Sequence, residues 1–147
     1  MSHPSRTLFV TGAAAGIGRA VAERFLQAGW FVGLYDVDEV GLAALQQRWG
    51  TERCVVARLD VSSADDWRAA LADFERLTGG RLDVLFNNAG IAVTRPFEEA
   101  DLARHHRLID INLKGLVNGC HLAFALLQRT PDSRVINMCS ASALYGQ

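Results

Sequence analysis

Several kinds of residue are scarce in this chain, and each scarcity excludes a class of protein. Only three of the 147 residues are cysteines and only three are prolines. The cysteines lie far apart, at positions 54, 120 and 139, so we expect neither a disulfide framework nor a zinc site. No run of about 18 apolar residues occurs, and no apolar stretch follows a charged start at the N-terminus. We therefore predict a cytoplasmic protein with no membrane partner and no signal peptide.

The chain also lacks an excess of charge of either sign, since 15 Lys and Arg residues balance 16 Asp and Glu residues to a net charge of -1. No basic patch can be inferred from this balance, so a nucleic-acid partner is not expected. Half of the residues are hydrophobic and 21% are charged, which excludes a disordered chain. The length is typical of a single domain with one hydrophobic core.

Short β-branched segments alternate with longer segments of helical periodicity. We predict strands at residues 7–10, 31–35, 54–59, 82–86 and 134–139. The segments between them predict four helices, the third opened by a capping box at Ser63–Asp66 and the fourth ended by Pro131. Their inner apolar residues are predicted to be Ile17, Val21, Phe25 and Ala28 in the first helix, Val40, Ala43, Ala44 and Leu45 in the second, Trp67, Ala70, Leu71, Phe74 and Leu77 in the third, and Ile109, Leu113, Leu116, Cys120, Phe124 and Leu127 in the fourth.

This alternation predicts the α/β class, with parallel strands joined by crossover helices. We expect a Rossmann-type doubly wound parallel sheet between two helical layers, a three-layer α/β/α arrangement. No linker, repeat or low-complexity segment interrupts the pattern, so residues 1–147 are expected to form one domain. Because the printed chain ends shortly after the fifth strand, we expect the sheet to be incomplete at its C-terminal edge.

Three glycines lie in the loop between the first strand and the first helix, where a helix N-terminus offers free N–H groups and a positive dipole end to an anion. Gly12 permits a tight turn, while Gly16 and Gly18 remove side chains where a phosphate and the neighbouring strand approach. We therefore predict that Gly12, Ala15, Gly16, Ile17 and Gly18 bind a dinucleotide cofactor. A flexible glycine-rich turn is the alternative.

Asp36 ends the second predicted strand, 18 residues after Gly18, near the spacing at which an acid meets the adenosine ribose. Its carboxylate can accept hydrogen bonds from both ribose hydroxyls but would repel a 2′-phosphate. No Arg or Lys lies at residues 13–15 or directly after Asp36 to neutralise such a phosphate. NAD is therefore predicted as the cofactor rather than NADP. The alternative is that Asp36, together with Asp38, only caps the following helix.

Together these motifs resemble the short-chain dehydrogenase/reductase family over the whole chain. The loop pattern Thr-Gly-x-x-x-Gly-x-Gly lies at residues 11–18, and an Asn-Asn-Ala-Gly motif lies at residues 87–90, directly after the fourth predicted strand. Asp36, Asp60, Asn112 and Ser140 lie at offsets similar to those of the family. The resemblance implies an NAD-dependent oxidoreductase that transfers a hydride between nicotinamide and a secondary alcohol or ketone substrate.

The resemblance also assigns binding roles to the motif residues. Asp60 and Val61 would contact the adenine. In the motif at residues 87–90, Asn88, Ala89 and Gly90 would lie near the cofactor, and the first asparagine would mainly stabilise the sheet. Side-chain amides at the carboxyl end of a parallel strand can satisfy backbone groups there, so a purely structural asparagine pair is the alternative.

Two polar residues are candidates for the chemistry itself. By resemblance, Asn112 belongs to the family's catalytic tetrad and holds a water in a proton relay, although an asparagine within a helix is otherwise an ordinary surface residue. Ser140 resembles the family's catalytic serine, whose hydroxyl bonds the substrate oxygen, and Ser142 is its rival. Cys139 is expected to be a buried small residue rather than a nucleophile.

One motif of the family is missing. By resemblance the base is the tyrosine of Tyr-x-x-x-Lys, yet the printed tyrosines are Tyr35 and Tyr145 and the single lysine is Lys114, so that motif does not occur. Tyr145 lies too close to Ser140 to replace this base. We interpret the chain as the N-terminal, cofactor-binding part of a dehydrogenase, truncated after the fifth strand, and expect little turnover from it alone.

Two other functions stay open. A non-catalytic module that binds or senses NAD is the alternative to an enzyme. The apolar face of the fourth helix could also pair with another chain, and the open sheet edge would favour association. We accordingly expect a homo-oligomer.

The other polar residues of the fourth helix receive no role. His105, His106 and His121 have no carboxylate or cysteine to complete a ligand set, so no metal site is expected. Three basic residues of this helix, Arg104, Arg107 and Lys114, are interpreted as its solvated side.

Overall fold

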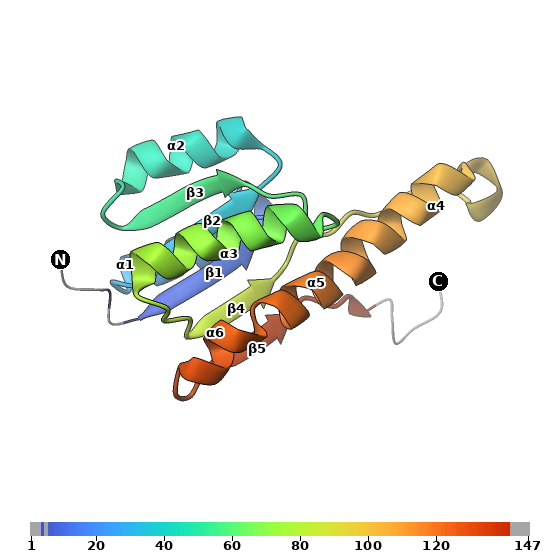
Figure 1. Ribbon diagram of the computed structural model, residues 1–147. Helices are drawn as coiled ribbons and strands as arrows, with labels where there is room; N and C mark the ends of the chain where they lie inside the picture. The colour runs from blue at the N-terminus through green and yellow to red at the C-terminus, as the bar shows by residue number, and fades with distance from the viewer. Residues whose placement is uncertain (1–3, 5, 142–147) are drawn as a thin grey trace.

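The computed structural model describes residue 4 and residues 6–141. Within these residues five parallel strands form one sheet, namely β1 (Thr7–Thr11), β2 (Phe31–Asp36), β3 (Cys54–Arg58), β4 (Val84–Asn87) and β5 (Arg134–Asn137). Their order is β3-β2-β1-β4-β5 (Figure 1), so the sheet is doubly wound from β1. Ser142 and Tyr145, both considered above, lie outside the described residues.

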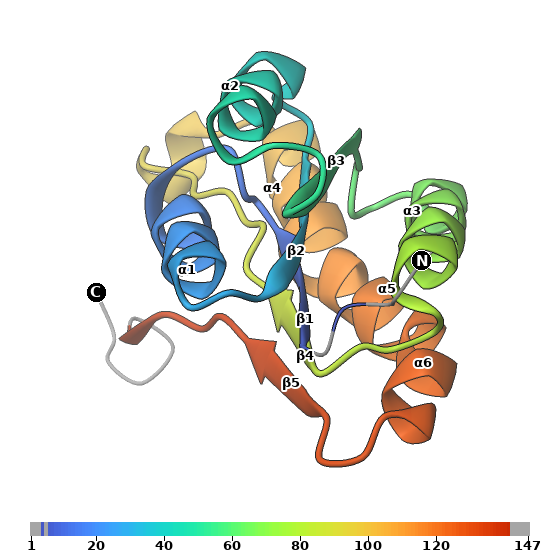
Figure 2. The same ribbon diagram turned by 90° about the vertical axis from the view of Figure 1, so that its left-hand side faces the viewer.

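Helices cover both faces of this sheet. They are α1 (Gly16–Gln27), α2 (Glu39–Trp49), α3 (Ala64–Thr78), the 3-10 helix η1 (Phe97–Glu99), α4 (Leu102–Ile109), the π-helix η2 (Asp110–Lys114), α5 (Gly115–Leu122) and α6 (Phe124–Arg129). Figure 2 shows α1 and α2 on one face and α3, α5 and α6 on the other. Leu8 and Val10 of β1 belong to one core cluster and Phe9 to the other. The predicted three-layer Rossmann-type fold is therefore confirmed.

The third helix follows its prediction most closely. Ser63 Oγ accepts a hydrogen bond from the Asp66 N–H at 3.1 Å and donates to Asp66 Oδ1 at 2.8 Å. Ser63 is therefore the N-cap, which satisfies a backbone donor that the first turn leaves unpaired. The reciprocal bond of a capping box is absent from this pair, because the Ser63 N–H bonds the Asp60 carbonyl. The predicted residues Trp67, Ala70, Leu71 and Phe74 are buried, together with Thr78.

The predicted fourth helix is divided. It consists of α4, η2, α5 and α6, with a turn at Ala123 between the last two. Half of its predicted inner face is wrong, because Leu113 and Phe124 are 59% and 61% exposed and Ile109 is also exposed. Leu127 is buried as predicted.

Small residues form the buried face of this segment instead. Gly115, Gly119 and Ala123 are buried at intervals of four residues. A Cβ atom on Gly119 would lie 2.8 Å from the Trp67 ring, and one on Gly115 would lie 2.6 Å from the Val61 side chain. The helix packs so close to its neighbours that large apolar residues cannot occupy this face.

The first two helices depart from prediction in the same way. Buried residues are Gly18, Ala22 and Leu26 in α1, and Leu42 and Leu45 in α2. Ile17 is 59% exposed and Val40 is 83% exposed, whereas both were predicted to face inward. Ala28, Ala43 and Ala44 are exposed as well. Leu45 is buried as predicted.

The sheet ends at β5 within the described residues, and all four residues of this strand are exposed. The strand is two residues shorter than predicted. An apolar hollow of about 310 Å³ lies on the α1 face, and its lining includes Ile17, Val21, Phe25, Ile136 and Met138. No helix in the part of the chain that the structure describes is long and apolar enough to cross a membrane.

Candidate functional site

The polar candidates gather at one edge of the sheet because parallel strands end on the same side. β1 ends at Thr11, β2 at Asp36, β4 at Asn87 and β5 at Asn137. In open α/β sheets, ligands bind at the carboxyl ends of the strands, where the strand order reverses. Here that point lies between β1 and β4, so the loops after these strands form the candidate site.

The glycine loop after β1 presents an uncapped helix N-terminus. Ala15 is the N-cap residue of α1 and gives no side-chain hydrogen bond to the helix. Gly16 has a φ of +56°, and a Cβ atom on it would meet nothing within 4 Å. A Cβ atom on Gly18 would collide with the Gly12 carbonyl. The loop therefore combines a tight turn at Gly12 with open space where a side chain of Gly16 would stand, at the N-terminus of the helix.

Asp36 is tied to this loop. Its Oδ2 accepts a hydrogen bond from the Ala14 N–H at 2.9 Å, and its Oδ1 accepts one from the Asp38 N–H at 3.1 Å. The cap of α2 is Asp38, whose Oδ1 accepts from the Gly41 N–H at 3.0 Å. The Asp36 carboxylate thus lies beside the glycine loop and is not itself the helix cap.

Thr11 and Asn88 hold the β1 loop against the β4 loop. The Thr11 hydroxyl accepts hydrogen bonds from the N–H groups of Asn88 and Ala89, both at 3.1 Å. Asn88 Nδ2 in turn donates to the carbonyls of Thr11 and Gly12, at 3.0 and 3.2 Å. The side chain of Asn88 therefore acts within the protein. Thr11 was not among the predicted site residues, although it is the first residue of the loop motif.

Asn87 links β4 to the edge strand and to α5. Its Nδ2 donates to Asn137 Oδ1 at 2.9 Å and lies 3.5 Å from Cys120 Sγ. A Cβ atom on Gly119 would collide with its Oδ1, so the asparagine fills the space beside the helix. Its position and contacts are those of a residue that holds the sheet together.

Asn112 lies in the π-helix and holds the loop after β4. Its Nδ2 donates to the Ile91 carbonyl at 2.8 Å, and its Oδ1 accepts from the Ile91 N–H at 2.9 Å. A π-turn widens the helix and is frequent at functional sites. One N–H and one oxygen lone pair of the Asn112 amide are used by Ile91. A water in a proton relay would therefore bond the second N–H, the second lone pair or the main chain of Asn112.

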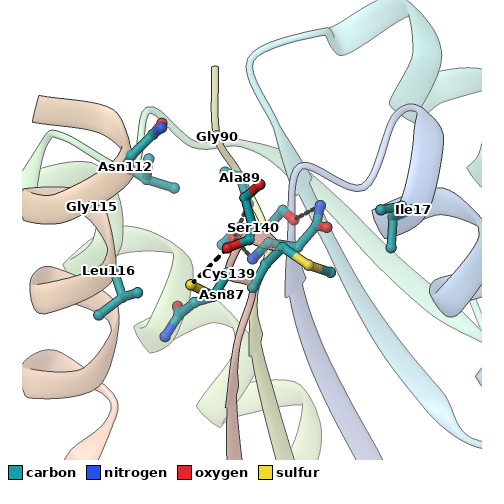
Figure 3. Close-up of a pocket in the computed structure, with 13 residues that line it drawn as sticks. Ile17, Asn87, Ala89, Gly90, Asn112, Gly115, Leu116, Cys139 and Ser140 are labelled. Atoms are coloured by element: carbon teal, nitrogen blue, oxygen red, sulfur yellow. Dashed lines mark hydrogen bonds between the residues drawn. The ribbon is translucent and has the colours of Figure 1, made fainter. Parts of the chain in front are cut away.

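A pocket of about 350 Å³ lies between these loops. Figure 3 shows Ser140 at its centre, with Asn112 and Leu116 on one side and Ile17 on the other. Its lining residues are Thr11, Ile17, Val61, Asn87, Asn88, Ala89, Gly90, Asn112, Gly115, Leu116, Met138, Cys139 and Ser140. Two predicted chemical residues, Ser140 and Asn112, therefore share one pocket. Cys139 is exposed here, so the expectation that it is buried is wrong.

Asp60 lies in the loop after β3 and belongs to a polar cluster that the sequence did not indicate. Arg107 Nη2 donates to Asp60 Oδ2 at 2.9 Å, and Ser62 Oγ donates to Asp60 Oδ1 at 2.6 Å. Burial alone would raise the pKa of Asp60, but the hydrogen bonds from Ser62 and Arg107 outweigh it and hold the pKa below its ordinary value. Arg107 is therefore paired with an acid as well as half exposed, in contrast to the purely solvated residue expected.

The described tyrosine and the lysine are engaged elsewhere. Tyr35 stacks on Phe9 with ring centroids 4.0 Å apart, and burial raises the pKa of its phenol far above the ordinary value. Lys114 pairs with Asp110 at 2.5 Å. Within residues 4 and 6–141, no three His, Cys, Asp or Glu residues lie together in a group that could hold a metal ion.

Comparison with known proteins agrees with this architecture. The family described as "short chain dehydrogenase" matches residues 6–147. L-fucose dehydrogenase of Oryctolagus cuniculus is 36% identical over 146 residues, which cover 99% of this chain and 50% of that protein. The 3-beta-hydroxysteroid dehydrogenase of Comamonas testosteroni is 36% identical over 138 residues, which cover 94% of this chain and 53% of that protein.

Solved structures show the same similarity. A short-chain dehydrogenase/reductase from Brucella melitensis, described as a glucose/ribitol dehydrogenase, is 38% identical with a TM-score of 0.91 over 99% of this chain and 60% of its own. The closed form of serine dehydrogenase complexed with NADP+ is 28% identical with a TM-score of 0.87, over 96% of this chain and 56% of its own. The chain spans about half the length of the curated relatives that it matches. It belongs to the short-chain dehydrogenase family of oxidoreductases.

Proposed function

We propose that this chain binds NAD across the carboxyl ends of its strands and is the cofactor-binding part of an oxidoreductase that acts on a secondary alcohol or ketone. The observation that carries the proposal is the N-terminus of α1, which has no side-chain cap and opens into free space at Gly16. Backbone N–H groups and the helix dipole favour an anion at such a place. The pyrophosphate of a dinucleotide would occupy this open space, which stays free because Gly16 has no side chain.

A pair of glycine variants tests the cradle. Gly16 and Gly50 both have positive φ, at +56° and +80°, and a Cβ atom on either would meet nothing within 4 Å. Gly16→Ala and Gly50→Ala therefore both place an alanine at a positive φ, but only the first puts a methyl group at the proposed phosphate site. We expect Gly16→Ala to weaken NAD binding at least about tenfold in calorimetric titration, and Gly50→Ala to leave it unchanged. Equal affinities in the two variants would contradict the proposal.

Asp36 supports NAD rather than NADP. Its carboxylate lies at the glycine loop through the Ala14 N–H, where it can accept hydrogen bonds from ribose hydroxyls and repel a 2′-phosphate. One structural relative was solved with NADP+, so the choice needs its own test. Replacing Asp36 with Ala should shift the ratio of NAD to NADP affinities toward NADP. An unchanged ratio would count against the ribose role.

The pocket is the proposed site where the nicotinamide of the cofactor meets the substrate. When bound, nicotinamide supplies the hydride acceptor or donor. The Ser140 hydroxyl would hydrogen-bond the substrate oxygen, and Asn112 would hold the neighbouring loop through Ile91. General acid–base catalysis of hydride transfer contributes about 10²–10⁴-fold, and the printed sequence holds no Tyr-x-x-x-Lys to supply it. Little turnover by the 147 residues is therefore expected.

The alternative is a module that binds or senses NAD without catalysis. Steady reduction of NAD by the purified 147-residue chain, lost in Ser140→Ala, would contradict the expectation of little turnover and exclude this module. A Tyr-x-x-x-Lys encoded shortly after Gln147 in the gene would favour the enzyme, whereas binding by a chain without that motif would favour the module.

We also propose that the chain forms a homo-oligomer. Large apolar side chains are exposed along α4, η2 and α5, among them Leu102, Ile109, Leu113 and Val117, and contiguous exposed apolar surface marks interaction sites. Light scattering on Val117→Lys tests this, with Val40→Lys on α2 as the control because Val40 is likewise exposed. A lower mass for Val117→Lys alone is expected, and a monomeric unchanged chain would contradict the proposal.

A further inference from the structure

Arg107 connects α4 to the loop after β3. Its Nη2 donates to Asp60 Oδ2 at 2.9 Å and its Nη1 donates to Ser62 Oγ at 3.1 Å. Ser62 Oγ donates in turn to Asp60 Oδ1 at 2.6 Å. The guanidinium thus holds Asp60 both directly and through Ser62. Its partners lie 47 and 45 residues earlier in the chain.

The donors around Asp60 leave one acceptor position on its carboxylate. An ionised carboxylate offers about four such positions. The Ser62 N–H at 3.0 Å and the Ser62 hydroxyl occupy Oδ1, and Arg107 occupies one position on Oδ2. Within the described residues, room remains on Oδ2 for one further donor. A fixed, ionised carboxylate with a single remaining acceptor position suits an amino group of a ligand.

The rest of α4 does not explain this pairing. None of the eight residues of α4 is buried, and its other ion pair, between Arg104 and Asp101, is local. The Asp60 side chain is 21% exposed, whereas the Arg107 side chain is 47% exposed. The long arginine therefore reaches from a solvent-exposed helix to a partly buried acid, and with Ser62 it holds the pKa of Asp60 below its ordinary value.

We infer that Arg107 is a positioning residue for the adenine ring, which fixes Asp60 so that Oδ2 accepts a hydrogen bond from the adenine amino group. The inference rests on the proposed binding of NAD and on the adenine contact expected for Asp60. It adds that recognition of the amino group depends on a residue of a distant helix. If Arg107 only held α4 in place, its loss would weaken the binding of every dinucleotide by the same factor.

Deamino-NAD separates these two roles, because hypoxanthine carries a carbonyl oxygen where adenine carries the amino group. The unchanged protein should prefer NAD over deamino-NAD by about tenfold or more, since hydrogen bonds to charged groups are among the stronger ones. In Arg107→Gln the preference should fall to within about threefold, mainly through weaker NAD binding. Arg107→Lys keeps the charge but not the forked contact, and an intermediate ratio is expected.

Arg104→Gln is the matched control, since Arg104 lies on the same exposed helix and, among the described residues, forms its ion pair with Asp101, the N-cap residue of that helix. Its ratio should equal that of the unchanged protein. An equal loss of affinity for both dinucleotides in Arg107→Gln would overturn the positioning role. A ratio of one in the unchanged protein would overturn the adenine contact while leaving dinucleotide binding intact. Failure to bind either dinucleotide would refute the proposed function itself.

Discussion

The Asn112 side chain hydrogen-bonds both main-chain polar groups of Ile91. The amide nitrogen donates to the Ile91 carbonyl at 2.8 Å and the amide oxygen accepts from the Ile91 N–H at 2.9 Å. Twenty-one residues separate the partners, and the π-helix presents Asn112 to the loop that follows the Asn-Asn-Ala-Gly motif. A side chain that pairs with both groups of one residue mimics a strand neighbour and fixes that loop beside the pocket.

Replacing Asn112 with Ala should release this loop. A net hydrogen bond is worth about 0.5–1.5 kcal/mol, so the Ile91 N–H should exchange with deuterium about two- to tenfold faster. Asn118→Ala is the control, because Asn118 bonds the Val61 carbonyl instead, at 3.0 Å. Exchange at Ile91, followed by NMR or mass spectrometry, should respond only to the first variant. Unchanged exchange in Asn112→Ala would show that the loop is held by other contacts.

Gly119→Ala should destabilise the protein, although alanine is the better helix former. The added Cβ would lie 2.8 Å from the Trp67 ring and would collide with Asn87 Oδ1. Overpacking of a dense core costs about 1–3 kcal/mol, which chemical denaturation would detect. His121→Ala, at an exposed position of the same helix, should change the free energy of unfolding by less than about 0.5 kcal/mol. A stabilised Gly119→Ala would mean that α5 can move away from α3.

The Asp66 carboxylate in the first turn of α3 should make stability depend on acid. The backbone N–H of Asp60 and the Ser63 hydroxyl hydrogen-bond Asp66, and with Arg58 they hold the pKa of Asp66 below its ordinary value. A lowered pKa in the folded state contributes stability above the unfolded value of about 3.9. That contribution is lost as the pH falls from there through the folded pKa.

Asp66→Asn should therefore lower the free energy of unfolding by about 1 kcal/mol at pH 7 and flatten its decline below about pH 4. Asp65→Asn makes the same charge change one residue earlier, but the Asp65 side chain is 93% exposed. Its denaturation curves should follow those of the unchanged protein at every pH. Equal acid sensitivity in Asp66→Asn and the unchanged protein would assign that sensitivity to another carboxylate.

Local signals predicted the frame of the molecule. The glycine loop, the Ser63 cap and the apolar strands each arise from residues close in sequence, and the structure places all of them in the predicted kinds of element. Part of the buried faces of α1 and α5 was predicted wrongly because hydrophobic periodicity weights large residues. At these helices the close approach selects Gly18 and Gly119 instead.

Long-range pairings could not be predicted from the sequence for a different reason. Arg107 lies 47 residues from Asp60, and Asn112 lies 21 residues from Ile91. Neither pair therefore produces a local sequence pattern. Motifs therefore located the strand ends, whereas tertiary contacts determined which side chains remain available to a ligand.

Tyr35 should make the stability of the fold depend on alkaline pH. Its ring is buried against Phe9, and burial raises the pKa of the phenol far above the ordinary value. A raised pKa in the folded state leaves stability intact below the unfolded value of about 10 and removes it as the pH rises further. The loss should approach about 1.4 kcal/mol per pH unit, because unfolding lets the phenol ionise.

Tyr35→Phe should remove this part of the alkaline decline. The phenol bonds the Ala70 carbonyl only at 3.5 Å, so the variant should unfold at nearly the same urea concentration as the unchanged protein at pH 8. Above about pH 10 the unchanged protein should become the less stable of the two. Cysteine and arginine titrations affect both proteins equally and cancel in the comparison. Parallel curves up to pH 11 would show that solvent reaches the Tyr35 phenol in the folded protein.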